Sequence, residues 1–485
     1  MTSAASFGLG RLAPEIVLLA AAIAAMLVHL FVRKGGRRAA GYVALAGIGA
    51  AAAALALTPP SGAGFFAGHL AVDGLALFFK AVILAAGALA IVLAFRFFDV
   101  EDGEPGEAYY LILLSIVGMS LAVSATDMVT TYVAFELFAI PSYVLAGIFK
   151  KERRSSEAGI KYFFLGTLSS AVMLLGMAFV YGLTGVTAYA EGGASLAGAN
   201  GLAAVVAMSL FFAGLFFKAA FVPFHMWAPD VYEGAPTPLV VFLSTAPKAA
   251  VVAILVRVMT VLFGGYALEW SGVLQAVAVA TMFWGNLAAL TQRSLKRMLA
   301  YSAIAQAGYL AIGLAAWEGS GGMAVLFYAA VYVVMNAGAF GLILLVDRGG
   351  RFDESVEGLA GLARRAPLAA VSALVLLLSL TGIPPTAGFM GKYFLFTAAV
   401  DKGMVLLAAA GALNSVISLF YYFRIGKALF LDDPAPVPPG SGLPAAGRIS
   451  PLVTVFLALA AAALLLLGLL PDLLSGPAAR AVLGG

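Results

Sequence analysis

Apolar residues in this chain gather into long runs that are separated by short polar loops. About fourteen of these runs are long enough to cross roughly 30 Å of hydrocarbon as a helix, which takes about 17–25 residues. The runs lie near residues 14–33, 39–57, 72–98, 108–125, 127–149, 159–184, 202–227, 237–263, 271–291, 298–317, 322–347, 367–400, 404–430 and 450–470. The pattern predicts an all-α polytopic membrane protein with about fourteen transmembrane helices.

Basic residues cluster in alternate loops. The clusters lie at 33–38, 150–154, 293–297, 348–365 and 424–448. With fourteen spans, all of these clusters fall on one side of the membrane, and only Arg11, Lys402 and Arg480 fall on the other. The positive-inside rule then places both termini on the non-cytoplasmic face. The first run has its basic stretch after it, the reverse of a signal peptide, so we expect a retained helix.

Prolines interrupt two of the runs. Pro223 lies in the seventh run, and Pro384 and Pro385 lie in the twelfth. Because proline lacks a backbone N–H and cannot continue a helix, we expect breaks at both places. The breaks are five spans apart, which predicts two five-helix repeats of opposite orientation. The predicted units are helices one to three, the first repeat, the second repeat, and a Pro-rich linker with helix fourteen, at 1–107, 108–265, 266–430 and 431–485.

Two loops on the basic side have sequences that predict a local structure. Residues 431–448 are rich in proline and predict an extended cytoplasmic linker. Residues 354–365 carry Val356, Leu359 and Leu362 at helical spacing, which predicts a short helix along the membrane surface.

Composition excludes several classes of protein. The chain is 63% hydrophobic and 11% charged with a mean hydropathy of +1.03, far from the usage of soluble domains. Its net charge of +4 comes from the loops, so it reflects topology and does not indicate nucleic-acid binding. The absence of cysteine excludes disulfides and thiolate-held iron–sulfur clusters. His29, His69 and His225 lie in separate segments, which argues against a haem or metal site.

The cations deepest in the apolar runs are mainly lysines. They are Lys80, Lys161, Lys218, Lys248 and Lys392. A charge at the bilayer centre costs about 2.5–3.5 kcal/mol on the insertion scale, so such residues require a partner or a use. An ammonium can release its proton in a desolvated site, whereas a guanidinium keeps it. The choice of lysine therefore favours proton exchange in hydrated cavities.

Other charged groups complete the set. Glu136 is the one carboxylate central to a run, and we expect it to pair with a buried cation, the alternative being a neutral packed side chain. His225, beside the first break, either relays protons or only packs into the space at the break. Lys80 and Lys161 lie nearer span ends, where a structural snorkelling role is equally open, and Arg257 can snorkel too.

Three long motifs, together with the lysine of the eighth run, carry a resemblance. They are FHMWAPDVYEGAPTP at 224–238, RSLKRMLAYSAIAQAGY at 293–309 and GIPPTAGFMGKYFLF at 382–396. With these motifs the chain resembles the family of NADH-quinone oxidoreductase subunit N, an antiporter-like membrane subunit of bacterial respiratory complex I. The resemblance runs from about span four to span thirteen.

The resemblance implies roles for the charged residues. In the family, the counterparts of Glu136 and Lys218 form an ion pair. Lys248 matches the central lysine of span eight, and Lys392 matches the span-twelve lysine that leads towards the outer half-channel. Lys161 looks like the family's lysine at the start of span six, on the side of proton uptake.

The resemblance also implies a function. The chain would translocate protons in the bacterial inner (plasma) membrane, driven by quinone reduction in neighbouring subunits of the oxidoreductase. It would bind no cofactor itself, since FMN, iron–sulfur clusters and quinone belong to partner subunits. Its partners would be neighbouring antiporter-like and small membrane subunits of complex I, lipid and protons. The alternatives are a subunit of an Mrp-type cation/proton antiporter or membrane-bound hydrogenase, against which the motif at 230–238 argues, and a scaffold whose charges only hold helices together.

Overall fold

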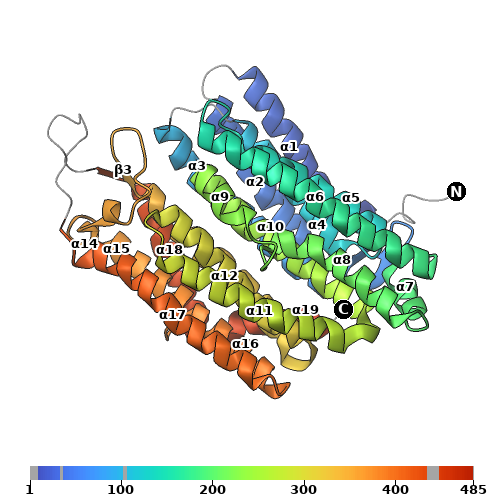
Figure 1. Ribbon diagram of the computed structural model, residues 1–485. Coiled ribbons are helices and arrows are strands. Elements are labelled where there is room, and N and C mark those ends of the chain that lie inside the picture. The colour runs from blue at the N-terminus through green and yellow to red at the C-terminus, as the bar shows by residue number, and fades with distance from the viewer. Residues whose placement is uncertain (1–8, 33–35, 102–105, 434–446, 484–485) are drawn as a thin grey trace.

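The computed structural model describes residues 9–32, 36–101, 106–433 and 447–483, most of them in long helices that lie side by side (Figure 1). The first ten helices are α1 Ala13–Phe31, α2 Gly36–Ala56, α3 Gly74–Val100, α4 Glu107–Ser124, α5 Met128–Ala146, α6 Arg153–Thr184, α7 Tyr189–Leu196, α8 Gly201–Ala219, α9 Trp227–Gly234 and α10 Thr237–Arg257. The others are α11 Ala267–Leu290, α12 Leu295–Ala315, α13 Gly322–Gly341, α14 Leu362–Arg365, α15 Pro367–Thr381, α16 Ala387–Asp401, α17 Val405–Phe430, α18 Pro451–Leu469 and α19 Asp472–Leu483.

Short elements join the long helices. Single 3-10 or π turns are η2 Leu9–Leu12, η3 Val258–Leu262, η4 Gly264–Tyr266, η5 Trp317–Gly321, η6 Leu342–Leu344 and η7 Glu357–Leu359. Two antiparallel strand pairs are β1 Ser61–Phe65 with β2 Leu70–Val72, and β3 Val346–Asp347 with β4 Arg448–Ile449. The hydrophobic pattern did not predict these strands, because they are short and lie in the loops.

The predicted membrane spans are confirmed. Within the described residues, 13 helices are long and apolar enough to cross a membrane, and the shorter apolar helix α15 makes up the fourteenth span together with α16. The protein is therefore a multi-pass membrane protein of the all-α class.

The predicted surface helix at 354–365 is wrong. Gly361, with a φ of 67°, separates η7 from α14 there, so only single turns form. Most of the Pro-rich linker, at 434–446, lies outside the described residues.

The predicted break in span seven separates α8 from α9. Ala220 ends α8 in the left-handed conformation with a φ of 61°, and the N–H of Phe221 donates to the carbonyl of Phe216 at 2.9 Å. This pattern is a Schellman cap, which closes the end of a helix. The following Val222–Pro223 bond is cis, and the Val222 N–H donates to Thr281 Oγ1 on α11 at 3.0 Å. The freed backbone groups thus find partners inside the protein, as a membrane interior requires.

The break in span twelve has the same local design. Gly382 ends α15 with a φ of 89°, and the N–H of Ile383 donates to the carbonyl of Leu378 at 3.0 Å. The Pro384–Pro385 bond is cis, and α16 begins two residues later. Both predicted breaks are therefore confirmed. The inverted relation of the two five-helix units stays a prediction.

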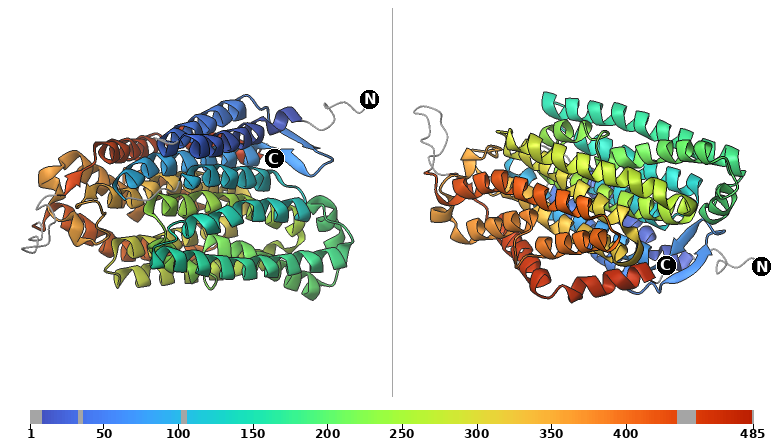
Figure 2. Two further views of the ribbon diagram at one scale, coloured as in Figure 1. Left: turned by 90° about the horizontal axis from the view of Figure 1, so that it is seen from above. Right: turned by 60° about the horizontal axis from the view of Figure 1, so that its bottom comes forward.

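The centre of the bundle is built from helices that are buried on all sides. All 21 residues of α10 are buried, and so are all residues of α12 except Arg297 and Tyr301. Helix α10 contacts α3, α4, α8 and α13, and α12 contacts α11, α13 and α16. Figure 2 shows α18 beside the N-terminal helices, and α19 contacts α3 and α13. A titratable group on α10 or α12 is thus surrounded by protein.

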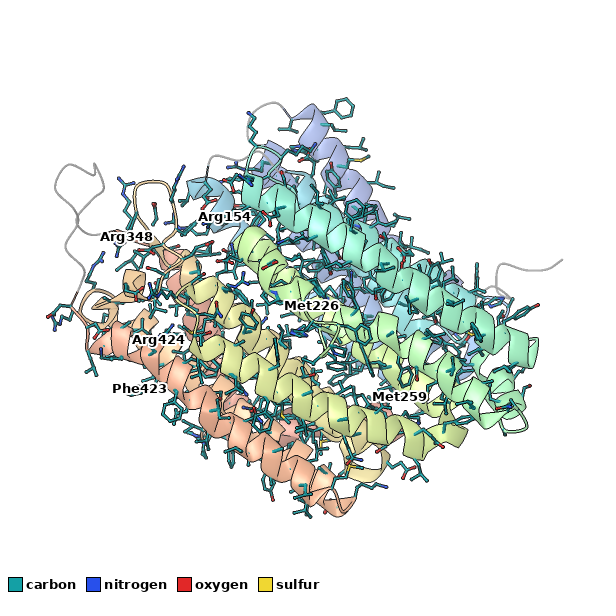
Figure 3. The ribbon with its side chains drawn as sticks, viewed as in Figure 1. Arg154, Met226, Met259, Arg348, Phe423 and Arg424 are labelled. Atoms are coloured by element: carbon teal, nitrogen blue, oxygen red, sulfur yellow. The ribbon has the colours of Figure 1, made fainter. Side chains whose placement is uncertain are left out.

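Figure 3 shows the two ends of the bundle. Arg154, Arg348 and Arg424, from three of the basic clusters, lie toward one end, Met226 lies near the middle, and Met259 lies toward the other end. The arrangement agrees with the predicted gathering of basic loops at one face. Which face is cytoplasmic stays a prediction.

Two charged residues that the sequence placed near span ends are buried and paired. Lys80 Nζ lies 2.7 Å from Glu15 Oε1, with the two side chains only 2% and 5% exposed. Arg257 donates from Nη2 to Asp73 Oδ1 at 2.7 Å and from Nε to the Val123 carbonyl at 2.8 Å. The snorkelling interpretation is therefore wrong for Lys80 and Arg257. Glu15 is thus a buried carboxylate that the sequence interpretation did not single out.

The Glu15–Lys80 pair gives a first prediction, on stability. Lys80→Met should destabilise the protein by about 3–5 kcal/mol, because it leaves a carboxylate buried without its cation. Glu15→Leu combined with Lys80→Met should recover most of that loss. Thermal unfolding of the detergent-solubilised protein measures both. As a control, Lys402→Met breaks the more exposed pair with Glu318 and should leave the unfolding temperature nearly unchanged. A double variant no more stable than Lys80→Met would contradict this.

Candidate functional site

Three of the predicted lysines lie deep in the membrane-spanning region. Lys218 is the last residue but one of α8, Lys248 lies in the middle of α10, and Lys392 lies in the second turn of α16. Their exposed fractions are 1%, 2% and 3%. Among the described residues, none of the three is within ion-pair distance of a carboxylate. Each ammonium is therefore held by other groups.

Aromatic rings surround Lys218. Its Nζ lies 4.7 Å from the ring centre of Tyr162, 4.8 Å from that of Tyr143, 5.4 Å from that of Phe138 and 5.9 Å from that of Phe135. These distances are those of cation–π interactions. The same Nζ is buried and has no hydrogen-bond partner within the described part of the chain. We call these four rings the aromatic cage.

Glu136, on α5, does not bond directly to Lys218. Its Oε1 is buried without a hydrogen-bond partner in the described regions, and Lys218 Nζ likewise has none. The direct ion pair that the resemblance implies is therefore wrong for this structure. Four aromatic rings lie around the ammonium in place of a carboxylate.

Lys248 binds the backbone of a neighbouring helix. Its Nζ donates to the Ala303 carbonyl on α12 at 2.7 Å, and the ring of Tyr332 on α13 lies 5.7 Å away. The Tyr332 hydroxyl donates to the Ser244 carbonyl at 2.9 Å, and Asn336 Nδ2 donates to Ser244 Oγ at 2.6 Å. The central lysine thus lies among polar groups from α10, α12 and α13.

Lys392 closes the second break. Its Nζ donates to the carbonyls of Leu380 and Thr381 at 3.0 and 2.9 Å and to Ser415 Oγ at 3.2 Å. Both carbonyls belong to the end of α15, where no helical N–H remains for them. The ring of Tyr309 lies 4.0 Å from the same nitrogen. The break therefore supplies the acceptors that hold this ammonium.

A glutamine links the surroundings of Lys248 and Lys392. Gln306 Nε2 donates to the Leu380 carbonyl at 3.0 Å, the same oxygen that Lys392 binds, and to Tyr422 Oη at 3.3 Å. The Tyr422 hydroxyl lies 2.5 Å from Ser302 Oγ, one residue before the carbonyl that binds Lys248. Sequence reasoning missed Gln306, because a neutral amide inside an apolar helix gives no charge signal.

His225 lies between α8 and α9, at the first break. Its side chain is 6% exposed, its Nδ1 is buried without a hydrogen-bond partner in the described regions, and its ring lies edge-on to Trp284 at 5.4 Å. Within the described residues His225 makes no hydrogen bond or ion pair with the buried lysines, so its relay role stays a prediction. Across the described residues, no three His, Asp or Glu side chains gather as metal ligands.

Lys161 lies apart from the buried lysines, in a charged network. Its Nζ binds Glu157 at 2.7 Å and Asp230 at 2.8 Å, and its side chain is 39% exposed. Arg297 Nη1 binds the same Asp230 at 2.9 Å and Glu233 at 2.7 Å. The network joins α6 and α9 to α12 and lines a cavity of about 210 Å³.

A larger polar cavity adjoins this network. It has a volume of about 990 Å³, and its lining includes Glu101, Glu152, Glu233, Lys296 and Glu354. Glu101 follows the end of α3, and burial raises its pKa above the ordinary value, with Lys296 acting in the opposite direction. A carboxyl group with a raised pKa exchanges protons closer to neutral pH. The cavity can thus collect protons at the end of the bundle that carries the basic loops.

The comparisons with known proteins decide the family. The profile of the family described as NADH:quinone oxidoreductase/Mrp antiporter, TM, matches residues 125–418. NADH-quinone oxidoreductase subunit N of Trichlorobacter lovleyi is 41% identical over 423 residues, which cover 87% of each chain. The chain belongs to the NADH-quinone oxidoreductase subunit N family. All six predicted site residues lie inside the matched region, from Glu136 to Lys392.

Solved structures agree with this subunit N assignment. A chain of respiratory complex I from Thermus thermophilus with bound aureothin has a TM-score of 0.80 and 32% identity, covering 97% of this chain and 100% of that one. A chain of the Mrp complex from Dietzia sp. has a TM-score of 0.83 and 26% identity, covering 98% of this chain and 97% of that one. The antiporter-like fold is thus shared more widely than the subunit N sequence.

Proposed function

We propose that this chain is a proton-translocating, antiporter-like membrane subunit of an NADH-quinone oxidoreductase. The observation that carries the proposal is the set of buried lysines, Lys218, Lys248 and Lys392, which lack carboxylate partners in the described structure. A lysine that is not neutralised by an ion pair can hold or release a proton at Nζ. FMN, iron–sulfur clusters and quinone would be supplied by partner subunits, and quinone reduction there would drive the movement of protons here.

We also propose that the lysines act on each other by charge repulsion. Two unit charges about 7 Å apart repel by roughly 2.4 kcal/mol at an effective dielectric of about 20. Moving one charge across 100 mV requires about 2.3 kcal/mol, so repulsion between neighbouring sites is comparable to the energy of moving a proton against the membrane potential. Protonation of Lys218 would favour proton loss from Lys248, and Lys248 would pass its proton by Gln306 and Tyr422 toward Lys392. Glu136 would bias Lys218 through the field, since it makes no direct bond.

Proton uptake would occur at the charged end of the bundle. The large cavity and the network of Lys161, Asp230 and Arg297 open there, and both contain exchangeable groups. We assign Lys161 to this uptake side. His225 would assist at the first break, where its Nδ1 is buried and free of hydrogen bonds to described residues.

The second candidate function is a subunit of an Mrp-type cation/proton antiporter or membrane-bound hydrogenase, which the likeness to the Dietzia Mrp complex favours. Affinity purification of the native assembly from mild detergent, followed by mass spectrometry, separates the two. We expect the chain to co-purify with other membrane subunits and an NADH-oxidising arm. Recovery with antiporter subunits and no NADH-oxidising activity would refute the oxidoreductase assignment.

We further propose that the chain lies in the bacterial inner membrane with its basic loops on the cytoplasmic face. The chain contains no cysteine, so single cysteines report topology cleanly. In intact cells, Asp401→Cys should react with a maleimide that does not cross the plasma membrane, and Arg351→Cys should react only after cell lysis. Both positions are exposed. The opposite labelling pattern would reverse the orientation.

The division of the chain is also a proposal. Residues 108–265 and 266–430 would form inverted repeats, with 1–107 before them and 431–485 after them. The matching Schellman caps at the two breaks, each followed by a proline and a new helix, support this division.

A further inference from the structure

We propose that Tyr162 is a positioning residue for Lys218, which it holds by the face of its ring, and that it couples Lys218 to helix α9 beyond the break. The proposal rests on the proposed function, since it concerns how one of the proton-carrying lysines is held. It assigns a role to a residue that carries no charge.

The first observation is the contrast among the buried lysines. Lys248 and Lys392 each donate to backbone carbonyls at 2.7–3.0 Å, whereas Lys218 has no hydrogen-bond acceptor in the described structure. Tyr162 provides the nearest ring face, at 4.7 Å. Because a cation–π contact leaves the N–H bonds unused, the ammonium is held without committing its protons to an acceptor.

The second observation is that the ring of Tyr162 is used on more than one side. It stacks on Trp227 with a centroid distance of 4.4 Å and an interplanar angle of 8°. Trp227 is the first residue of α9, and its Nε1 donates at 2.8 Å to the carbonyl of Phe217, the residue before Lys218. A closed circuit of contacts thus runs from Lys218 through Tyr162 and Trp227 back to the end of α8.

The third observation is the position of Tyr162 in α6. The preceding residue, Lys161, binds Asp230 of α9 at 2.8 Å. Adjacent residues of α6 therefore hold α9 by an ion pair and by a ring stack. The Tyr162 hydroxyl is buried without a hydrogen-bond partner in the described regions, so the ring face, and not the hydroxyl, makes these contacts.

A mechanical consequence follows. The attraction between Nζ and the ring faces depends on the positive charge of the ammonium. Loss of the proton weakens the contact between α8 and Tyr162, while the Tyr162–Trp227 stack remains. The charge on Lys218 thus changes how tightly the two halves of the broken helix are tied together, and the break can respond to the arrival and departure of a proton.

The experiment compares two replacements of Tyr162 in the intact complex in membrane vesicles. Tyr162→Phe keeps the ring face and removes the unpartnered hydroxyl, and Tyr162→Leu removes the face. We expect Tyr162→Leu to lower the number of protons pumped per NADH oxidised to the level of Lys218→Ala, and Tyr162→Phe to retain the original ratio. The content of assembled complex, measured in the same membranes, corrects for differences in assembly.

Tyr232→Leu is the matched control. Tyr232 is a buried tyrosine that contacts Trp227 edge-on at 5.6 Å, and it is not one of the four rings around Lys218. Its replacement should leave the pumping ratio unchanged in the complex that assembles. A loss as large as that of Tyr162→Leu would show that packing around Trp227 is responsible, and would overturn the proposal.

Other outcomes separate this proposal from the proposed function. If Tyr162→Leu pumps normally, or if Tyr162→Phe and Tyr162→Leu lose pumping equally, the role of the ring face is overturned. The proposed function stands in both cases as long as Lys218→Ala still lowers the pumping ratio. Normal pumping by Lys218→Ala overturns both. If Tyr162→Leu does not assemble, Tyr162→Met decides, because it also removes the ring face and fills the site with an apolar side chain. Unchanged pumping there contradicts the proposal, and a lowered ratio supports it.

Discussion

Lys248→Ala should slow proton transfer through the centre of the chain by roughly 10²-fold, the usual contribution of a positioned proton-transfer group. Lys248 is 2% exposed and is the buried lysine of α10, the helix that is surrounded on all sides by others. The measurement is the number of protons pumped per NADH oxidised by the assembled complex in vesicles, which should fall by the share that this chain carries.

Lys248→Arg separates proton exchange from a purely structural charge. An arginine keeps a positive charge and can donate to the Ala303 carbonyl, but it does not release its proton. If the charge only holds helices together, the arginine variant should pump normally. We expect it to assemble and yet to pump as poorly as the alanine variant.

The control for this series is Lys402→Ala, at the end of α16. Its side chain is 36% exposed and pairs with Glu318 outside the buried path, so its removal should leave the ratio unchanged. The decisive contrary result is undiminished pumping in the alanine variants of Lys218, Lys248 and Lys392 alike. That result would also remove the basis for the proposed function.

The spans and breaks could be predicted from the sequence because their causes are local. A run of apolar residues must cross the membrane as a helix, and Pro223 and Pro385 each remove a backbone donor where the two runs break. The burial of Lys218, Lys248 and Lys392 follows from their positions in such runs. These features depend on a few consecutive residues, so no knowledge of packing was needed.

The partners of the charged residues could not be predicted, because packing between distant helices decides them. Glu15 and Lys80 both stand near span ends, where surface exposure is the usual outcome, yet the two side chains are buried and meet at 2.7 Å. The cage around Lys218 is another case. Tyr162 and Phe138 lie on α6 and α5, and an aromatic residue in an apolar helix gives no signal of contact with a cation.

Gln306→Leu should interrupt the polar link between Lys248 and Lys392. Gln306 is 1% exposed and receives a hydrogen bond from the Tyr328 hydroxyl at Oε1 while its Nε2 donates to Leu380 and Tyr422. Leucine has a similar volume but no polar atoms. It leaves the buried Tyr328 hydroxyl without its acceptor, at a cost of about 1–3 kcal/mol. Proton transfer to Lys392 should therefore slow, and the thermal stability of the protein should fall.

Thr131→Val provides the comparison that isolates the link. Thr131 is also 1% exposed, and its hydroxyl lies 2.5 Å from that of Tyr189. Neither of these two residues contacts one of the three lysines within the described part of the chain. Both variants remove buried hydrogen bonds, so both should lower the unfolding temperature. Only Gln306→Leu should lower the protons pumped per NADH oxidised, because only Gln306 shares an acceptor, the Leu380 carbonyl, with Lys392. Equal pumping by the two variants would mean that protons pass between Lys248 and Lys392 by another route.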